Sequence, residues 1–364
     1  MGQTKHIAVC VVFALLLAAG FLLCVFGPKE TYSDSERRSL AAFPKVSAYT
    51  VRTGRFMSDF ETYVTDTFPF RDSFRTVKAV CSSAVFRRQD NHGIYEADGY
   101  LSAVEYPLDE KSLKRASDRF RYICEKYLTR ANAVFLSVIP DKNCFLAEES
   151  GHLSMDYADF EKRMEDSCDF AEYISISDLL QREDYYKTDT HWRQERIVDV
   201  AERLLQKMGA KAEQRFQIQT LSRDFYGVYY GQSALPASPD TLSYLTGEAI
   251  DSCYVYDGQN QKEISVYDFE KAAQKDPYEI FLSGPLSLVT LENQKASKEK
   301  KLVIFRDSFG SSIAPLLCGG YSKITLADIR YIHPDLLGKF VDFDACDVLF
   351  LYSTLVMNHS DTLK

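Results

Sequence analysis

Short runs of almost wholly apolar residues recur along this chain, and they constrain its fold more than any other feature. A strand that is buried on both faces has such a run, because neither of its faces meets water. Among these runs lies a helical pattern, in which apolar residues at the spacing of one helix face end before Gly209. Buried strands that alternate with helices are typical of a parallel sheet covered on both faces. The sequence therefore predicts an α/β fold whose strands include residues 134–139, 173–176, 302–305, 324–326 and 348–352.

Composition and charge narrow the class of protein. The 364 residues suffice for one large core or two modest ones, and 46% hydrophobic with 26% charged residues describe a globular chain. The net charge of −9 is spread along the sequence without a Lys/Arg-rich tract, which argues against a general nucleic-acid-binding protein. The nine cysteines are scattered, with no CxxC spacing and no disulfide framework. We expect neither a metal ion nor a cofactor.

The N-terminal segment has a composition of its own. Residues 7–27 form an uncharged run of about twenty residues, long enough to cross the hydrocarbon of a bilayer as a helix. The run ends in bulky residues where cleavage would need small ones, so we favour an uncleaved signal anchor over a cleaved signal peptide or a buried core helix. Lys5 holds the N-terminus in the cytoplasm by the positive-inside tendency. The sequence thus predicts a single-pass membrane protein whose bulk is extracytoplasmic.

The rest of the chain divides by its patterning. Apolar residues recur at helical spacing in two stretches before residue 90, which predicts a pair of helices. Farther along, residues from about 214 to 297 are polar and rich in tyrosines and turns, and we interpret them as an insertion. The expected parts are a membrane anchor at 1–28, a lead-in with the helical pair at 29–90 and a main domain at 91–364.

A serine-containing turn follows one of the predicted strands. The motif Asp307-Ser308-Phe309-Gly310 comes directly after the apolar run 302–305. Catalytic groups in open parallel sheets gather at the carboxyl ends of the strands, so we expect the Ser308 hydroxyl at that edge. Backbone N–H groups at the start of the following helix could bind an oxyanion there. Taken alone, the motif is more simply explained as a helix cap.

A second motif, Asp189-Thr190-His191-Trp192, supplies the groups that such a serine needs. A hydroxyl is a poor nucleophile until a base takes its proton, which a histidine can do near neutral pH. A carboxylate on the other imidazole nitrogen fixes the tautomer and stabilises the imidazolium. This motif alone could also cap a helix, and no second His or Cys lies at metal-ligand spacing from His191. Together the motifs predict a Ser308, His191 and Asp189 site in which the first two side chains lie within hydrogen-bonding distance.

At these residues the sequence resembles a known family. Residues 185–192 resemble the signature of the DHHW proteins and are similar to that of the alginate O-acetylation proteins, all of which are SGNH-hydrolase-like. Residues 301–309 match their serine motif, with Arg306 in the place of the glycine of a G-D-S motif. Thr190 stands at the second letter of DHHW. Further matching segments are residues 35–40 with 43–44, 66–72, 140–142, 225–227 and 328–331.

The resemblance implies an SGNH-hydrolase-like parallel sheet and a triad in which Ser308 is the nucleophile, His191 the general base and Asp189 the orienting acid. It also implies acetyl transfer to or from hydroxyls of a cell-surface polysaccharide. In the resembled systems a membrane-bound O-acyltransferase supplies the acetyl group, so we expect such a partner. Thr190 lies outside the triad, whereas Arg306 bears on how closely the backbone approaches the substrate.

Four further residues are candidates for substrate contact. Trp192, the only tryptophan, follows His191 directly, and Tyr186 lies shortly before it. Aromatic faces at this place suit stacking on a sugar ring, and they suit packing in a core equally well. Lys142 and Arg330 follow predicted strands and could reach the same edge of the sheet.

The leading functional hypothesis is a membrane-anchored, extracytoplasmic O-acetyltransferase or acetylesterase that acts on polysaccharide hydroxyls. The alternative is a catalytically silent carbohydrate-binding or scaffold protein of a polysaccharide assembly complex, which Arg306 and the tyrosine-rich segment would support. A plain secreted esterase for small acyl substrates is a third hypothesis, and the anchor argues against it because tethering suits work on a surface polymer. Transfer and hydrolysis differ only in the hydroxyl that enters the acyl-enzyme.

Overall fold

The computed structural model describes residues 2–33, 35–36, 38–212, 214–274, 276–293, 295–296 and 300–364. Arg37, which belongs to one of the matching segments, lies outside the described residues, as do positions 275, 294 and 297 of the expected insertion. The chain forms two compact units. One comprises residues 1–91 with 231–236, and the other comprises residues 92–230 with 237–364.

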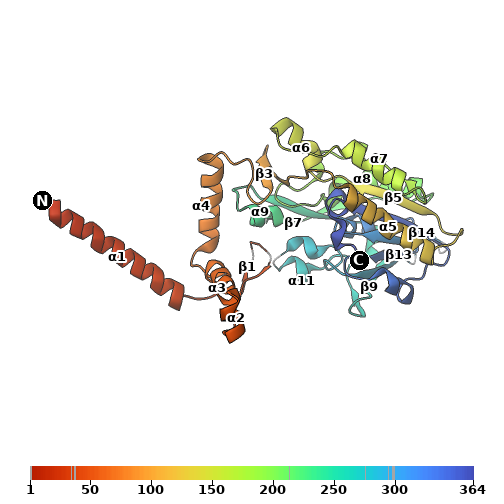
Figure 1. The fold of residues 1–364 in the computed structure, drawn as a ribbon. Coiled ribbons are helices and arrows are strands. Elements are labelled where there is room, and N and C mark those ends of the chain that lie inside the picture. Colours follow the sequence, from red (N-terminus) through yellow and green to blue (C-terminus); the bar gives the residue numbers. More distant parts are fainter. Residues whose placement is uncertain are drawn as a thin grey trace. The chain divides into compact units, whose positions relative to one another are not determined.

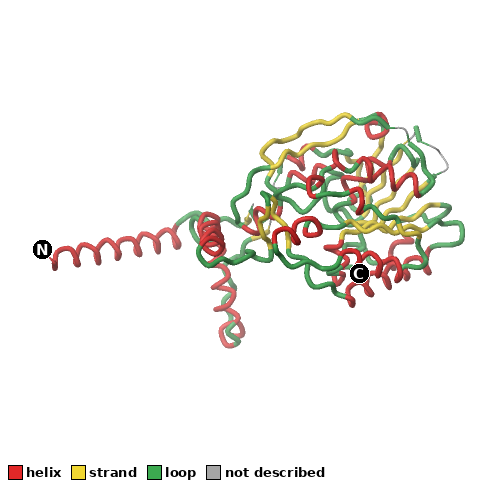
Figure 2. Tube along the Cα trace, turned by 90° about the horizontal axis from the view of Figure 1, so that it is seen from above, coloured by secondary structure: helices red, strands yellow, loops and turns green. Residues whose placement is uncertain are grey.

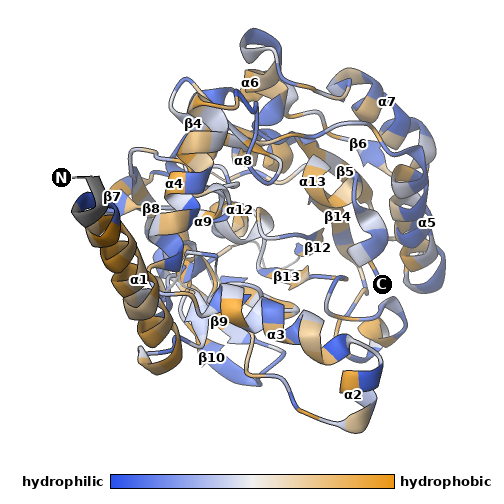
Figure 3. Cartoon of the chain, turned by 60° about the vertical axis from the view of Figure 1, so that its left-hand side comes forward, coloured by the Kyte–Doolittle hydropathy of each residue, from blue (hydrophilic) through white to orange (hydrophobic). Residues whose placement is uncertain are grey.

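The first unit consists mainly of helices (Figure 1). Its first helix, α1 (Gly2–Phe26), contains a segment, Lys5–Phe26, that is long and apolar enough to cross a membrane. Figure 3 shows the orange of hydrophobic residues along most of this helix. The expected helical pair is present as α3 and α4. The elements after α1 are β1 (Tyr32–Ser33), β2 (Arg38–Ser39), α2 (Ala48–Arg52), α3 (Arg55–Asp66) and α4 (Arg71–Ala84).

A sheet of eight strands, within the described residues, forms the core of the second unit (Figure 2). Five neighbouring strands pair in parallel, and the other three extend one edge in antiparallel order. The α/β class expected from the sequence is therefore confirmed. Across the sheet, the strands are β10 (Lys262–Ile264), β9 (Cys253–Asp257), β11 (Leu288–Asn293), β13 (Lys323–Ala327), β12 (Lys301–Arg306), β14 (Cys346–Ser353), β5 (Val134–Ile139) and β6 (Glu172–Tyr173).

Both faces of the central strands are buried. Along β12, Leu302 and Ile304 belong to one apolar core, whereas Val303 and Phe305 belong to the other. Because neither face meets water, the strand is apolar at consecutive positions, and polar groups are displaced to its ends. The helices that contribute to the first core are α8 (Val198–Lys207) and α12 (Gly310–Leu317), and those that contribute to the second are α5 (Glu110–Tyr127) and α7 (Tyr157–Ser167).

The segment expected as an insertion is partly built into the sheet. Three of its strands, β9, β10 and β11, form the antiparallel edge next to β13. In β9 only Val255 and Asp257 are buried, so this strand lacks the continuous apolar run of the central strands. The remaining part forms a separate hairpin of β7 (Gln217–Phe225) and β8 (Asp240–Thr246), with α9 (Val228–Ser233) between its strands in sequence.

Short elements connect these strands, and several of them flank the candidate site. One is η4, a 3-10 helix that lies between β10 and β11 in sequence. These connecting elements are β3 (Ile94–Ala97), β4 (Tyr100–Ala103), α6 (Asn143–Ser150), η1 (Ser177–Leu179), η2 (Arg182–Asp184), η3 (Gln194–Arg196), α10 (Glu248–Asp251), α11 (Phe269–Ala272), η4 (Pro277–Ile280), η5 (Pro334–Lys339), α13 (Thr354–Met357) and η6 (Ser360–Thr362).

Candidate active site

The serine turn lies between two regular elements. Strand β12 ends just before it and helix α12 begins just after it, so Ser308 stands at the carboxyl end of a central strand. The Asp307 carboxylate fixes this turn by accepting hydrogen bonds from the Phe309 amide (3.0 Å), the Ser353 amide (2.8 Å) and the Ser353 hydroxyl (2.6 Å). Because Ser353 ends the neighbouring strand β14, the turn is locked to the sheet. Among the described residues, no side chain makes a cap hydrogen bond at Phe309, the residue directly before α12.

Arg306, which replaces the glycine of a G-D-S motif, supports this turn from the core. Its side chain has no exposed surface, and its guanidinium donates to the carbonyl oxygens of Asp307 (3.2 Å) and Leu286 (3.2 Å). Burial lowers the pKa of this guanidinium. A Cβ atom on Gly310 would lie 2.6 Å from the Cβ of Arg306, so the turn packs closely on the arginine stem. Arg306 therefore occupies none of the exposed surface around the serine.

The two sequence motifs meet in space, although 117 positions separate His191 from Ser308. The imidazole Nε2 of His191 lies 2.7 Å from the Ser308 Oγ, and its Nδ1 lies 2.6 Å from an Asp189 carboxylate oxygen. Asp189 is fully buried and His191 is 8% exposed, whereas Ser308 is only half-buried. A carboxylate, an imidazole and a hydroxyl in this order form the hydrogen-bonded chain that activates a serine nucleophile.

Backbone groups also hold the Asp189 carboxylate. The oxygen that faces the imidazole accepts a bond from the His191 amide (3.0 Å), and the other oxygen accepts one from the Val228 amide (2.8 Å). A Cβ atom on Gly227 would lie 2.1 Å from the Asp189 Cβ, which is closer than side chains can approach. The absence of a side chain at Gly227 therefore sets how closely the hairpin segment approaches the aspartate.

Asp240, the first residue of β8, anchors the chain just before Asp189. Its carboxylate accepts hydrogen bonds from the amides of Lys187 and Thr188 (2.8 Å each) and from the Thr188 hydroxyl (2.6 Å). The Thr188 oxygen in turn accepts a bond from the Gly227 amide (2.9 Å). We call residues 187–192 the histidine loop. The β7–β8 hairpin fixes this loop through bonds between side chains and backbone.

Tyr278, from η4, lies flat against the imidazole of His191. The two ring centroids are 3.9 Å apart and the rings are inclined by only 7°. The Tyr278 hydroxyl donates to the Ser312 Oγ (3.0 Å), and the Trp192 indole N–H donates to the same oxygen (2.9 Å). Because Ser312 belongs to α12, these aromatic side chains tie the histidine loop to the helix that follows Ser308.

Three residues that shape this site were not identified from the sequence. Gly227 belongs to a segment that matches the family, but its contact with Asp189 could not be inferred from that match. Asp240 and Tyr278 lie in the segment interpreted as an insertion, and no local motif marks either of them. Their contacts are with residues far away in sequence, which single-sequence patterns do not reveal.

Three of the four residues expected to contact substrate are buried. Trp192 and Tyr186 have no exposed surface, and Lys142 is 1% exposed. The Lys142 ammonium donates to three backbone carbonyls, including that of Tyr186 (2.7 Å), and burial lowers its pKa to about 7. The expectation of substrate contact is corrected for these residues, because their burial leaves no surface for a sugar. They pack and position the histidine loop.

Arg330 is the candidate that retains some exposed surface. Its side chain is 19% exposed, and its guanidinium binds both oxygens of Asp328 (3.0 and 2.7 Å). This ion pair holds the guanidinium at the end of β13. Within the part of the chain that the structure describes, no group of three or more His, Cys, Asp or Glu side chains could hold a metal ion.

Comparisons with known proteins place this fold. No family model and no curated protein matches the sequence. Among solved structures, a DHHW family protein from Eubacterium siraeum matches with a TM-score of 0.58 at 18% identity, over 72% of this chain and 91% of that one. PatB1 from Bacillus cereus, solved with a sulfonyl adduct, matches with a TM-score of 0.56 at 14% identity, over 74% and 95%. The O-acetyltransferase domain of AlgJ from Pseudomonas putida matches with a TM-score of 0.45 at 10% identity, over 73% and 92%.

The first two matches define the class of fold. The chain shares its α/β fold with a DHHW family protein and with PatB1. The resemblance found in the sequence motifs and the similarity of the structures thus agree on the DHHW proteins. A shared fold does not define a reaction, because the reaction depends on the residues of the site.

Proposed function

We propose that this protein is a membrane-anchored, extracytoplasmic O-acetyltransferase or acetylesterase that acts on hydroxyls of a cell-surface polysaccharide. The single observation that carries this proposal is the 2.7 Å contact between the Ser308 Oγ and the His191 Nε2, with Asp189 on the other nitrogen. The least buried member of this set is the half-buried serine, which is the group that must reach an acyl donor. The acetyl specificity comes from the resemblance of the motifs to those of the alginate O-acetylation proteins.

In the proposed reaction, His191 takes the proton of the Ser308 hydroxyl while the Oγ attacks the carbonyl carbon of an acetyl ester. The tetrahedral intermediate breaks the bond to the donor oxygen, and the proton on His191 passes to that oxygen. The acetyl group is now on the serine. A sugar hydroxyl or a water molecule then gives its proton to His191 and attacks the acetyl carbonyl carbon. As the bond from that carbon to the Ser308 Oγ breaks, His191 returns the proton to the serine oxygen. Asp189 keeps the proton on Nδ1, so Nε2 remains the base.

The oxyanion of that intermediate needs a hydrogen-bond donor. In the serine turn, the Phe309 and Gly310 amides already donate to Asp307, and the Ser311 amide donates to the Ser308 carbonyl. Among the residues that the structure describes, the Ser308 amide has no hydrogen-bond partner. We therefore assign the oxyanion to the amide of the nucleophile itself.

The proposed location follows from α1. Its segment Lys5–Phe26 is apolar enough to span a bilayer, and Lys5 favours a cytoplasmic N-terminus. An enzyme tethered in this way remains close to a polymer at the cell surface. By analogy with the resembled systems, a membrane-bound O-acyltransferase would supply the acetyl group.

The test compares two neighbouring serines. Full-length protein in detergent is incubated with 4-nitrophenyl acetate, and the release of nitrophenol is followed for the wild type, Ser308→Ala and Ser311→Ala. We expect Ser308→Ala to lose at least about 10³-fold in kcat, because the nucleophile is gone. The Ser311→Ala variant removes a buried hydroxyl from α12, the helix that follows Ser308, and should stay within about threefold of the wild type. Equal rates for the wild type and Ser308→Ala would reject the proposed nucleophile.

A second measurement separates transfer from hydrolysis. Oligosaccharides are added as acceptors to the same reaction, and acetylated products are detected by mass spectrometry. Transfer predicts acetylated sugar at the expense of free acetate, and hydrolysis predicts acetate alone. Binding of glycan without any ester cleavage by the wild type would instead support a silent scaffold protein.

A further inference from the structure

One face of α4 is apolar and exposed. Phe74, Val77 and Cys81 recur at the i, i+3, i+7 spacing of a single helix face, and Val85 continues it just beyond the helix. Phe74 is 56% exposed, Val77 58% and Val85 68%. Burial of such apolar side chains stabilises a protein because it removes their surface from water. The Phe68 ring packs edge-on against Phe74, with centroids 5.6 Å apart, yet more than half of the surface of Phe74, Val77 and Val85 stays exposed. Burial of that surface is left to a partner outside the described residues.

The helix packs on its own unit through a different side. Ala79 is fully buried, and Arg75 donates to the carbonyl oxygens of Gly231 (2.9 Å) and Gln232 (3.2 Å). With about 3.6 residues per turn, Arg75 and Ala79 lie on the side of the helix opposite Val77. The apolar face is therefore not the face that holds α4 in place. Contacts within the unit do not explain why the residues of this face are apolar.

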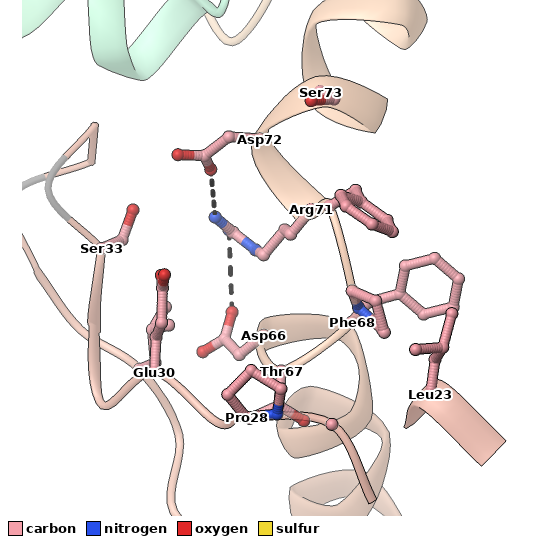
Figure 4. Close-up of a pocket in the computed structure, with 14 residues that line it drawn as sticks. Leu23, Pro28, Glu30, Ser33, Asp66, Thr67, Phe68, Arg71, Asp72 and Ser73 are labelled. Carbon is pink, nitrogen blue, oxygen red and sulfur yellow. Dashed lines mark hydrogen bonds and ion pairs between the residues drawn. The ribbon is translucent and has the colours of Figure 1, made fainter. Parts of the chain in front are cut away.

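The start of α4 lies beside the end of α1. A pocket of about 370 Å³ is lined by Leu23 and Gly27, at the end of α1, and by Phe68 and Arg71, at the start of α4. Figure 4 shows Leu23 on the same side of this pocket as Phe68. Because the apolar segment of α1 can cross a bilayer, its end marks the level at which the chain would leave the membrane. At that level α4 begins.

Basic side chains border the apolar face. Residues 71–88 contain five basic side chains and one acidic one, in a chain whose net charge is −9. Two of the five pair with Glu36, and the other three are Lys78, Arg87 and Arg88. An apolar helix face bordered by basic residues is the pattern of a helix that lies in the interface of a membrane, where the basic residues are attracted to anionic lipid.

We propose that the face of α4 formed by Phe74, Val77, Cys81 and Val85 binds the surface of a bilayer that contains anionic lipid, next to the point where α1 leaves it. The apolar side chains enter the boundary between headgroups and acyl chains, and the basic side chains contact the phosphates. This contact would hold the lead-in segment at the membrane. The inference goes beyond acetyl chemistry and rests only on α1 crossing the bilayer.

The test uses contact quenching of tryptophan by brominated lipids. Full-length protein is reconstituted into vesicles of brominated phosphatidylcholine and phosphatidylglycerol. The native Trp192 is fully buried, so it contributes a constant background. In the Phe74→Trp variant, we expect the new indole to shift to the blue and to lose emission to the bromine atoms. The matched variant Ser83→Trp, on the opposite side of the same helix, should show neither change.

The outcomes distinguish membrane contact by α4 from membrane insertion of α1 alone. Loss of the Phe74→Trp quenching when phosphatidylglycerol is omitted, or when Lys78, Arg87 and Arg88 are changed to Glu, supports the proposal. No quenching, or equal quenching of both variants, overturns it even when the chain still sediments with the vesicles through α1. A blue shift that depends on protein concentration and resists the brominated lipid also overturns it, because it identifies a second copy of the chain as the occupant. Ester hydrolysis by each variant verifies that the fold is intact.

Discussion

The two halves of the candidate active site are held in different ways. Ser308 follows a central strand, and three hydrogen bonds of Asp307 lock its turn to the strand and helix around it. His191 and Asp189 lie between η2 and η3, in a loop without a helix or strand of its own. Contacts from several separate elements hold that loop, among them those of the Asp240 carboxylate, the Val228 amide and the Tyr278 ring.

This difference shows where the site is vulnerable. The serine turn lies between a strand and a helix that many other contacts hold in place. The loss of one contact of the turn therefore leaves its position unchanged. A loop without ladder hydrogen bonds can shift when one of its contacts is lost, and a displacement of about 1 Å at a reacting group can cost about 10²-fold in rate. Substitutions around the histidine loop should therefore lower the reaction rate more than they lower stability.

The largest effect within the loop is expected for Asp189→Asn. One carboxylate oxygen serves the imidazole and the other serves the Val228 amide, so an amide nitrogen in either place opposes a donor to a donor. We expect kcat for ester hydrolysis to fall by about 10³–10⁴-fold, since the tautomer of His191 is no longer fixed. Asp257→Asn, at a buried aspartate of the antiparallel edge, is the matched control and should stay within about threefold. Similar rates for the two variants would show that Asp189 does not orient the histidine.

The next effect tests the close approach of the hairpin. In Gly227→Ala, the added methyl group would lie 2.1 Å from the Asp189 Cβ, so the loop or the hairpin must shift. We expect a loss of about 10²-fold in kcat, with the α/β sheet intact by circular dichroism. An alanine variant with full activity would contradict the role assigned to this glycine.

A smaller effect is expected where Tyr278 stacks on the imidazole. Tyr278→Leu removes the flat ring that lies 3.9 Å from His191, and kcat should fall by roughly tenfold because the imidazole orients less well. Tyr278→Phe keeps the ring and loses only the bond to Ser312, so it should retain most of the activity. If the leucine variant is as active as the phenylalanine variant, stacking has no part in positioning His191.

Glu105 lies outside the histidine loop, so the smallest effect on rate is expected there. Its prediction concerns the stability of the protein instead. Burial raises the pKa of this carboxyl group from 4.5 to about 7. The folded protein therefore retains a proton between these pH values that the unfolded chain releases, and the free energy of unfolding falls as pH rises from 4.5 to 7. In the wild type this decline in the free energy of unfolding between pH 4.5 and pH 7 should amount to about 1–3 kcal/mol. Glu105→Gln has no proton to lose and should not show it. Urea unfolding at several pH values measures it, and an unchanged slope in the variant would contradict this account of Glu105.

The same comparison explains what could be predicted from the sequence. The serine half follows from the continuous apolar run of β12 and the turn residues after it, which are local signals. The partnership of Ser308 with His191 could be anticipated because each residue type has a defined chemical need for the other. Asp240 and Tyr278 could not be found in this way, because their contacts with the loop depend on how the β7–β8 hairpin and η4 pack.

The burial of individual side chains near the site could not be predicted from the sequence. Trp192 and Tyr186 lie next to the histidine motif, Lys142 follows a predicted strand, and their side chains are of kinds that bind sugars. The structure gives them almost no exposed surface, because the aromatic rings pack in the core and the ammonium binds backbone carbonyls. Proximity in sequence to a catalytic motif therefore did not distinguish a substrate contact from a residue that positions the loop.

The central claim is that His191 activates Ser308 as a nucleophile, and covalent trapping tests it most directly. Wild-type protein, Ser308→Ala and His191→Ala are treated with phenylmethanesulfonyl fluoride, and the modified peptide is located by mass spectrometry. The account predicts one sulfonyl group on Ser308 of the wild type and none on either variant over the same time. Modification of another residue, or equal modification of Ser308 with and without His191, would contradict it.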